Sequence, residues 1–143
     1  MLNICIYNNC IGKCVRFNPS NTNTMTYKEK AKDIYNQLQQ GQLLTAFDKY
    51  YADDVVMTEP RGTRNGKSEC RAYEEQFLNN IETFHSLEIN NVASDEAAGT
   101  TFVESTMDVT FKGGHRAKME QVTVQQWKGD QIVHERFYYD NAQ

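Results

Sequence analysis

Between Thr100 and Lys112 the side chains alternate, and this period of two constrains the fold more than any other feature. One side carries Val103, Ser105, Met107, Val109 and Phe111, and the other side carries Glu104, Thr106, Asp108 and Thr110. Such a pattern is typical of a strand with one covered face and one face in water. Turn signals at Gly113-Gly114 and Gly129-Asp130 separate it from two further strands, 115–127 and 131–139, which predicts an antiparallel meander.

The period is helical in the first part of the chain. Apolar residues recur every three or four positions in 27–40, in a shorter segment 43–51 and in 67–81, which predicts three helices. Short strands are expected at 55–59 and at about 84–92. Thr24 or Thr26 would cap the first helix, with Glu29 as the capping-box partner of Thr26. Pro60 would end the first strand before a polar loop to Gly66. Helices followed by strands predict an α+β fold whose helices cover one face of a curved sheet.

Composition limits the class of protein. A chain of 143 residues, with 39% hydrophobic and 11% aromatic residues, forms one soluble domain with enough apolar material for a core and a cavity wall. The net charge of −4 argues against a nucleic-acid surface, and no apolar run is long enough to span a membrane. Three of the four cysteines precede residue 15, at spacings that match no zinc or disulfide template. We therefore expect a cytoplasmic protein.

Residues 1–24 differ from the remainder of the chain. They are rich in Asn and Cys, show no sustained period and lack the uninterrupted apolar stretch of a secretory signal. We predict a flexible extension at 1–24 and a domain at 25–143. One hypothesis is that Met25 is the natural start; the alternative is a genuine disordered leader. The intact mass of protein from its native source would distinguish them.

Three segments resemble a known superfamily: YADDVVMTEP from Tyr51, NGKSECRAYEEQF from Asn65, and VTVQQWKGDQIVHERFYYD from Val122. Together they resemble the nuclear-transport-factor-2-like superfamily, and within it the SnoaL-like polyketide cyclases and ketosteroid-isomerase-like proteins, over about 26–141. The resemblance implies a conical α+β barrel with a largely apolar cavity at its wide end. It also implies a homodimer that uses the outer sheet face. This superfold hosts many functions, so it indicates fold more strongly than activity.

The resemblance also implies candidate catalytic residues. Ketosteroid isomerases use a carboxylate base, a tyrosine donor and a protonated carboxylic acid. Alignment of the Ala-Asp-Asp turn without gaps puts Glu59 at the position of the base and Tyr35 at that of the tyrosine. The third position falls near Thr123, between Gln121 and Gln125, and none of these is an acid. This departure argues against steroid isomerisation and leaves proton abstraction beside a carbonyl open.

We expect Glu59 to point into the cavity, where lost solvation would raise its pKa towards neutral and suit a general base. The alternative is a solvated residue at the end of a strand. Asp140, at the end of the last strand and near the expected cavity mouth, is a second candidate acid/base, and it too could be solvated.

Two glutamates depend on strand register. A one-residue change in the Gly113-Gly114 turn would move Glu120 or Glu135 between cavity and solvent. The run His134, Glu135 and Arg136 is interpreted as a charge ladder on the outer face.

The remaining candidates are cavity walls. Seven residues are predicted to line the substrate site, although each could be plain core: Tyr73, Phe77, Met107, Thr123, Trp127, Phe137 and Tyr139. The three histidines have no metal-site spacing, no nucleophile motif is present, and no Gly-rich phosphate loop occurs, so we expect neither metal nor organic cofactor.

Two functions remain open. The first is a cofactor-free enzyme that isomerises or cyclises a hydrophobic carbonyl compound, with Glu59, Tyr35 and Asp140 in the acid–base roles. The second is a non-catalytic module for ligand binding or dimerisation. An open pocket of roughly 300 Å³ or more would favour an enzyme or ligand binder. A cone filled by Trp127, Phe137 and Met107 would favour a structural role. A limonene-type epoxide hydrolase is disfavoured, because no Asp-Arg-Asp set can be assembled on the inner wall.

Overall fold

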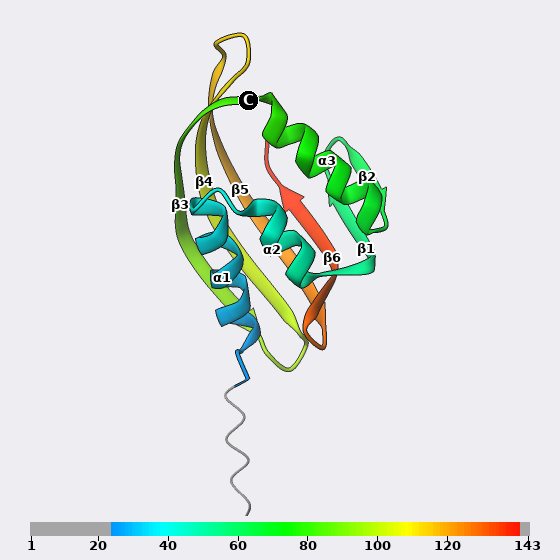
Figure 1. The fold of residues 1–143 in the computed structure, drawn as a ribbon. Coiled ribbons are helices and arrows are strands. Elements are labelled where there is room, and N and C mark those ends of the chain that lie inside the picture. Colours follow the sequence, from blue (N-terminus) through cyan, green and yellow to red (C-terminus); the bar gives the residue numbers. More distant parts are fainter. Residues whose placement is uncertain (1–23, 141–143) are drawn as a thin grey trace, which may run out of the picture.

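The computed structural model describes residues 24–140. Two helices come first, then two strands, a third helix and four more strands (Figure 1). The elements are α1 (Tyr27–Gln39), α2 (Leu43–Tyr50), β1 (Tyr51–Glu59), β2 (Gly62–Asn65), α3 (Lys67–Asn80), β3 (Ile81–Asp95), β4 (Thr100–Phe111), β5 (Arg116–Lys128) and β6 (Gln131–Tyr138). The α+β prediction is confirmed. The predicted extension 1–24 lies, apart from Thr24, outside the described residues.

The six strands form one sheet in the order β2-β1-β6-β5-β4-β3. All neighbours are antiparallel except β1 and β6, which run parallel. The sheet curls around the helices but does not close, because β2 and β3 remain at its two edges. Figure 1 shows α1 and α2 against the concave face, with α3 lying across the side of β1 and β2. The expected cone is therefore an open, curled sheet with helices inside it.

The main differences from the expected elements are at β1 and β2. Strand β1 begins four residues earlier than expected, at Tyr51. The expected polar loop contains β2, which pairs with β1 from Val56↔Asn65 to Glu59↔Gly62. The polar sequence of β2 has no apolar period, so its strand conformation depends on backbone hydrogen bonds to β1 rather than on a pattern of its own. Helix α3 and β3 meet directly at Asn80 and Ile81.

Helix α1 begins as its sequence predicts. The Thr26 hydroxyl accepts a hydrogen bond from the Glu29 backbone N–H at 3.2 Å, and the Glu29 carboxylate accepts one from the Thr26 N–H at 2.7 Å. This reciprocal capping box satisfies two backbone donors at the start of the helix. The helix buries Ala31, Ile34 and Tyr35 against the sheet.

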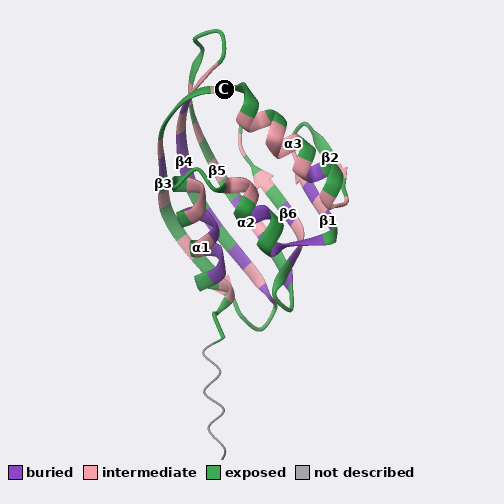
Figure 2. Ribbon diagram, in the orientation of Figure 1, coloured by how far each residue is buried: buried purple, intermediate pink, exposed green. Residues whose placement is uncertain are grey.

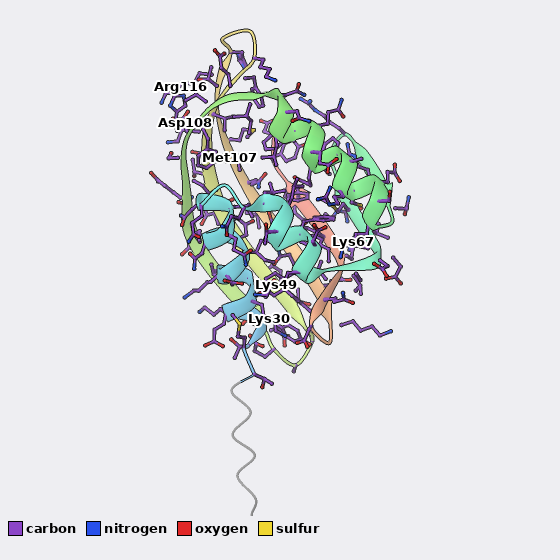
Figure 3. All side chains as sticks on the ribbon, in the orientation of Figure 1. Lys30, Lys49, Lys67, Met107, Asp108 and Arg116 are labelled. Carbon is purple, nitrogen blue, oxygen red and sulfur yellow. The ribbon has the colours of Figure 1, made fainter. Side chains whose placement is uncertain are left out.

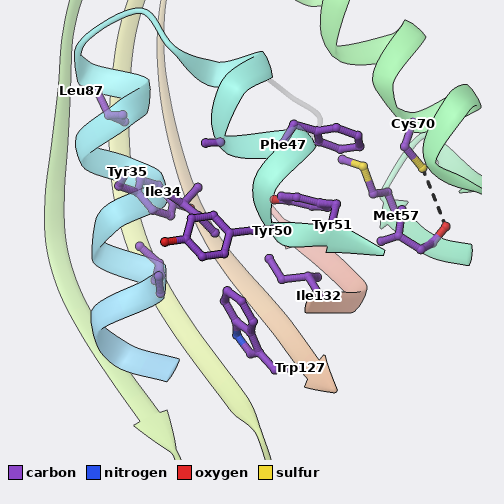
Figure 4. Packing of buried hydrophobic residues seen from close by; sticks show 14 of the residues in the cluster. Ile34, Tyr35, Phe47, Tyr50, Tyr51, Met57, Cys70, Leu87, Trp127 and Ile132 are labelled. Carbon is purple, nitrogen blue, oxygen red and sulfur yellow. Dashed lines mark hydrogen bonds between the residues drawn. The ribbon is translucent and has the colours of Figure 1, made fainter. Parts of the chain in front are cut away.

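The core lies between the helices and the inner sheet face, where Figure 2 shows the buried segments. Aromatic pairs join the layers: Phe47 stacks on Tyr51 with ring centroids 4.3 Å apart, and Tyr50 meets Trp127 edge-on at 5.9 Å (Figure 4). Cys70 of α3 is fully buried, so α3 packs tightly over β1.

Ion pairs connect the edges of this assembly. Lys30 of α1 is mostly buried, and its Nζ lies 2.7 Å from Oδ1 of Asp130 in the β5–β6 turn. Asp108 and Arg116 pair at 2.7 Å near the β4–β5 hairpin (Figure 3).

Within residues 24–140, no helix combines the length and apolar character needed to cross a membrane.

A register shift in β6 determines which of its side chains face inward. Trp127 pairs with Ile132, but the preceding residue, Gln126, pairs with His134, so Val133 is an extra residue on β6. A bulge of this kind reverses the inward–outward alternation beyond it. Ile132 and Glu135 are consequently both buried, although they are three positions apart.

Candidate functional site

A cavity of about 620 Å³ lies between the three helices and the concave face of the sheet. Its apolar walls include Leu38, Phe47, Phe77, Met107, Phe111 and Phe137. Its polar walls include three carboxyl groups, Glu59, Glu74 and Glu135, and the hydroxyl-bearing Tyr35, Tyr51, Tyr73 and Tyr139. The cone is thus not filled by its own side chains, and the volume is in the range of small-molecule sites.

Glu59, at the end of β1, faces this cavity, and its side chain is only 9% exposed. Its Oε2 accepts a hydrogen bond from the Tyr139 hydroxyl at 2.8 Å. Its Oε1 lies 2.7 Å from an Arg64 guanidinium nitrogen, in an ion pair whose angle does not complete a hydrogen bond. Arg64 in turn lies over the Tyr73 ring, 3.2 Å from its centroid. The carboxylate is therefore held by the Arg64 cation and by the Tyr139 hydroxyl.

The expected rise in the pKa of Glu59 is wrong. Burial raises this pKa, but hydrogen bonds from Tyr73 and Tyr139 and the Arg64 guanidinium together lower it below its usual value. The sequence reasoning considered lost solvation alone and could not foresee the donors, which come from α3, β2 and the end of the chain. The ionised, multiply bonded form of Glu59 is a weak base.

Tyr35 is buried and borders the cavity. Its hydroxyl donates to Thr123 Oγ1 at 3.1 Å. Burial raises the pKa of Tyr35 well above its usual range, so the phenol stays protonated. Tyr35 and Glu59 thus face one cavity, as expected, but the Tyr35 hydroxyl already donates its proton to Thr123.

Glu135 is one of the two glutamates that the sequence analysis could not assign to cavity or solvent. It is 2% exposed and borders the cavity, whereas His134 and Arg136 are more exposed, so its assignment to an outer charge ladder is wrong. The Tyr51 hydroxyl donates to its Oε2 at 2.7 Å and Gln125 Nε2 donates to its Oε1 at 2.9 Å. Burial raises the pKa of Glu135 to about 7, although both hydrogen bonds oppose the rise.

Glu74 was missed by the sequence analysis. It lies on α3, one turn after Cys70 and three residues before Phe77, so it shares their inward face. Burial, helped by the negative charges of Glu135 and Glu59, raises the pKa of Glu74 to about 8, although the Arg64 charge opposes the rise. A signal was present, because Glu74 falls on the apolar stripe of α3. Glu135 likewise shares its side of β6 with Phe137, which was predicted to face inward.

The predicted wall residues divide into two groups. Tyr73, Phe77, Met107, Phe137 and Tyr139 border the cavity. Thr123 and Trp127 do not: Thr123 is buried beneath Tyr35, and Trp127 packs in the core with its Nε1 donating to Thr101 at 2.9 Å. Whether the first group binds a substrate stays a prediction.

The edge of the cavity carries two exposed acids. Asp140 and Glu120 both border it, and both are solvent-exposed. This exposure separates them from Glu135, which is enclosed. Among residues 24–140, no three His, Cys, Asp or Glu side chains are grouped as metal ligands.

Comparisons with solved structures show the same fold. A protein from Mesorhizobium loti, proposed to be a SnoaL-like polyketide cyclase, is 32% identical, with a TM-score of 0.69 over 80% of this chain and 100% of that one. A proposed polyketide cyclase from Pseudomonas putida is 16% identical, with a TM-score of 0.71 over 83% and 95% of the two chains. An NTF2-like protein from Burkholderia pseudomallei is 20% identical, with a TM-score of 0.70 over 82% and 94%.

Two comparisons by sequence gave different results. A search of curated protein sequences found no match. The family model described as "SnoaL-like domain" matches residues 25–139. This range includes every helix and strand of the part of the chain that the structure describes, and the three enclosed carboxyl groups of the cavity. The chain therefore belongs to the SnoaL-like domain family.

Proposed function

We propose that this protein binds a small hydrophobic carbonyl compound and catalyses proton transfer beside its carbonyl group without a cofactor. The observation that carries the proposal is a pair of cavity-facing carboxyl groups, Glu74 and Glu135, whose pKa values are both raised to near neutral. Acid–base groups work best when their pKa lies near the working pH. Carboxyl groups with no such role are seldom placed in a partly apolar cavity.

The two carboxyl groups suit different roles. Glu135 has the lower pKa and is the base that removes a proton from the carbon next to the carbonyl. Glu74 has the higher pKa, stays protonated near pH 7 and donates to the carbonyl oxygen, where negative charge develops. Return of the proton to another carbon gives isomerisation. Attack of the enolate carbon on a second carbonyl gives ring closure.

The surrounding residues fit supporting roles. Glu59 is less suited to be the base, because Tyr139, Tyr73 and Arg64 stabilise its ionised form. Its negative charge instead helps to keep Glu74 protonated. Tyr35 adds a neutral phenol to the wall, and Asp140 remains a second acid/base candidate at the cavity edge. Apolar side chains such as Phe77 and Phe137 exclude water from the reacting atoms.

A test that needs no natural substrate is deuterium exchange. The protein is incubated in D₂O with a panel of hydrophobic ketones, and NMR follows loss of the hydrogen next to the carbonyl. We expect at least one ketone to exchange faster than in buffer, and Glu135→Gln to reduce that rate by about 100-fold or more. The matched control is Glu120→Gln, since Glu120 borders the same cavity from an exposed position.

The same panel separates the two functions left open by the sequence. Ketones that bind, as judged by displacement of a fluorescent apolar probe, but exchange no faster than in buffer would indicate a ligand-binding module. Exchange that survives in Glu135→Gln and in Glu74→Gln alike would remove both residues from the mechanism.

We further propose a homodimer formed through the outer sheet face. Phe102, Val122 and Tyr138 are 42%, 39% and 52% exposed. Val122 lies directly opposite Tyr138, and Phe102 lies opposite Val124, so these side chains share one face of β4, β5 and β6. Burial of such a patch against its symmetric copy would stabilise a dimer.

A further inference from the structure

A chain of hydrogen bonds passes through the core and ends on Glu135. Trp127 Nε1 donates to Thr101 Oγ1 at 2.9 Å, and Thr101 Oγ1 donates to Gln125 Oε1 at 2.8 Å. Gln125 Nε2 then donates to Glu135 Oε1 at 2.9 Å, while the Tyr51 hydroxyl donates to Oε2 at 2.7 Å. Thr101 and Gln125 are fully buried and Trp127 is 6% exposed, so water does not supply substitute partners.

The chemistry of the donors gives this chain a direction. An indole N–H can only donate, so Thr101 Oγ1 must accept from Trp127. The single Thr101 proton then points to Gln125, which requires the amide oxygen on that side and the NH₂ group on the other. An amide NH₂ cannot accept a proton, so Glu135 Oε1 faces a group that only donates.

The other carboxyl oxygen has a different partner. A phenol hydroxyl can donate or accept, so Tyr51 can donate to an ionised Oε2 and can accept from a protonated one. Tyr51 also borders the cavity, and it contributes this hydroxyl from β1.

We propose that Gln125 is a positioning residue for Glu135, held in one amide orientation by Trp127 and Thr101, and that the exchangeable proton resides on Oε2 beside Tyr51. Oε1 stays a hydrogen-bond acceptor in both protonation states. This inference rests on the proposed function of Glu135 as the base, because it names the oxygen that accepts the substrate proton.

Other groups act on Glu135 and enter the design of the test. Tyr51 from β1 and Gln125 from β5 donate hydrogen bonds to Glu135. The negative charge of Glu135 helps to raise the pKa of Tyr35 from α1. Glu74 from α3 is the other titrating acid nearby, and its protonation depends on the charge of Glu135. The measurements therefore use full-length protein with Glu74→Gln. The enclosed carboxyl groups that remain are Glu135 and Glu59, and the pKa of Glu59 is lowered, so it is already ionised where Glu135 titrates.

The readout is the infrared C=O band of protonated Glu135, identified by its loss in Glu135→Gln and followed against pH. If Oε2 carries the proton, Oε1 is the carbonyl oxygen and Gln125 bonds to it. Gln125→Met should then move the band to higher frequency, whereas Tyr51→Phe should leave its frequency nearly unchanged. Loss of one donor to the ionised carboxylate should also raise the pKa of Glu135 by about one unit in Gln125→Met.

The distant member of the chain gives the most specific test. In Thr101→Val the valine has nearly the shape of threonine but cannot donate a hydrogen bond to the Gln125 amide. This variant should therefore raise the pKa of Glu135, although residue 101 has no hydrogen bond to Glu135 itself. Thr101→Ser keeps the hydroxyl and should restore the wild-type pKa. Fluorescence of Trp127 and thermal unfolding confirm that each variant is folded. If Thr101→Val does not fold, Gln125→Met provides the test in its place.

Two outcomes would overturn the inference: a band shift in Tyr51→Phe with none in Gln125→Met, or a pKa of Glu135 that is equal in Thr101→Val and Thr101→Ser. Neither readout uses turnover. The expected band shifts without ketone exchange would reject only the proposed function. Ketone exchange lost in Glu135→Gln, without any effect of Thr101→Val, would reject only this inference.

Discussion

Replacement of Glu135 by glutamine should stabilise the protein above neutral pH, although it removes a residue of the proposed site. The pKa of Glu135 is about 7 in the folded protein, against about 4.3 in an unfolded chain. Because the folded pKa is raised, the stability that the residue contributes is complete below about pH 4 and is lost as pH rises to about 7. One pKa unit corresponds to about 1.4 kcal/mol, so the loss is roughly 3.5 kcal/mol by pH 8.

Glutamine keeps the shape of the side chain and cannot ionise. Its oxygen can still accept from Gln125, and its NH₂ group can donate to the Tyr51 hydroxyl. The free energy of unfolding of Glu135→Gln, minus that of wild type, should therefore rise by roughly 3.5 kcal/mol between pH 4 and pH 8. Removal of the Glu135 charge also eases ionisation of Glu74, which adds to the rise.

The measurement is urea unfolding at several pH values, followed by the fluorescence of Trp127, the only tryptophan. Glu120→Gln, at the exposed cavity edge, is the control and should change little with pH. A difference between Glu135→Gln and wild type that is the same at pH 4 and pH 8 would refute the reasoning, because it would mean that Glu135 ionises in the folded protein at its ordinary pKa.

Three further predictions concern other parts of the fold. Tyr139→Phe removes a hydrogen bond to the ionised Glu59 and should lower the free energy of unfolding by about 1 to 2 kcal/mol at pH 7. The pKa of Glu59 is lowered, so this loss should fade as acid protonates the carboxylate. Equal losses at pH 7 and pH 3 in urea unfolding would contradict the prediction. Gly99→Ala should destabilise by about 1 to 3 kcal/mol, because Gly99 has a φ of +64° and a Cβ there would lie 2.9 Å from the Trp127 carbonyl oxygen; an unchanged melting temperature would contradict this. Tyr138→Glu should convert a dimer into monomers in sedimentation analysis, and a wild-type monomer would reject the proposed interface.

Much of the architecture is determined locally, which is why the sequence predicts it. The capping box at Thr26 and Glu29 and the alternation within β4 involve neighbouring residues, and their periods follow from helix and strand geometry. The inward position of Glu59 was anticipated from a resemblance to known proteins, and the structure agrees. The lowered pKa of Glu59 was not anticipated, because the groups that lower it come from elements distant along the chain.

The sequence by itself determined the helices, most strands, their order and the polarity of their faces, because each follows from local spacing. Only the tertiary structure decided which carboxyl groups share the enclosed cavity. One extra residue in β6, at Val133, reverses the alternation and turns Glu135 inward. The packing of α3 over β1 then brings Glu74 close enough for the charge of Glu135 to raise its pKa. Local spacing pointed to the inward sides of α3 and β6. It could not give the pKa values of Glu74 and Glu135 or bring the two together, because register and desolvation depend on residues far apart in the chain.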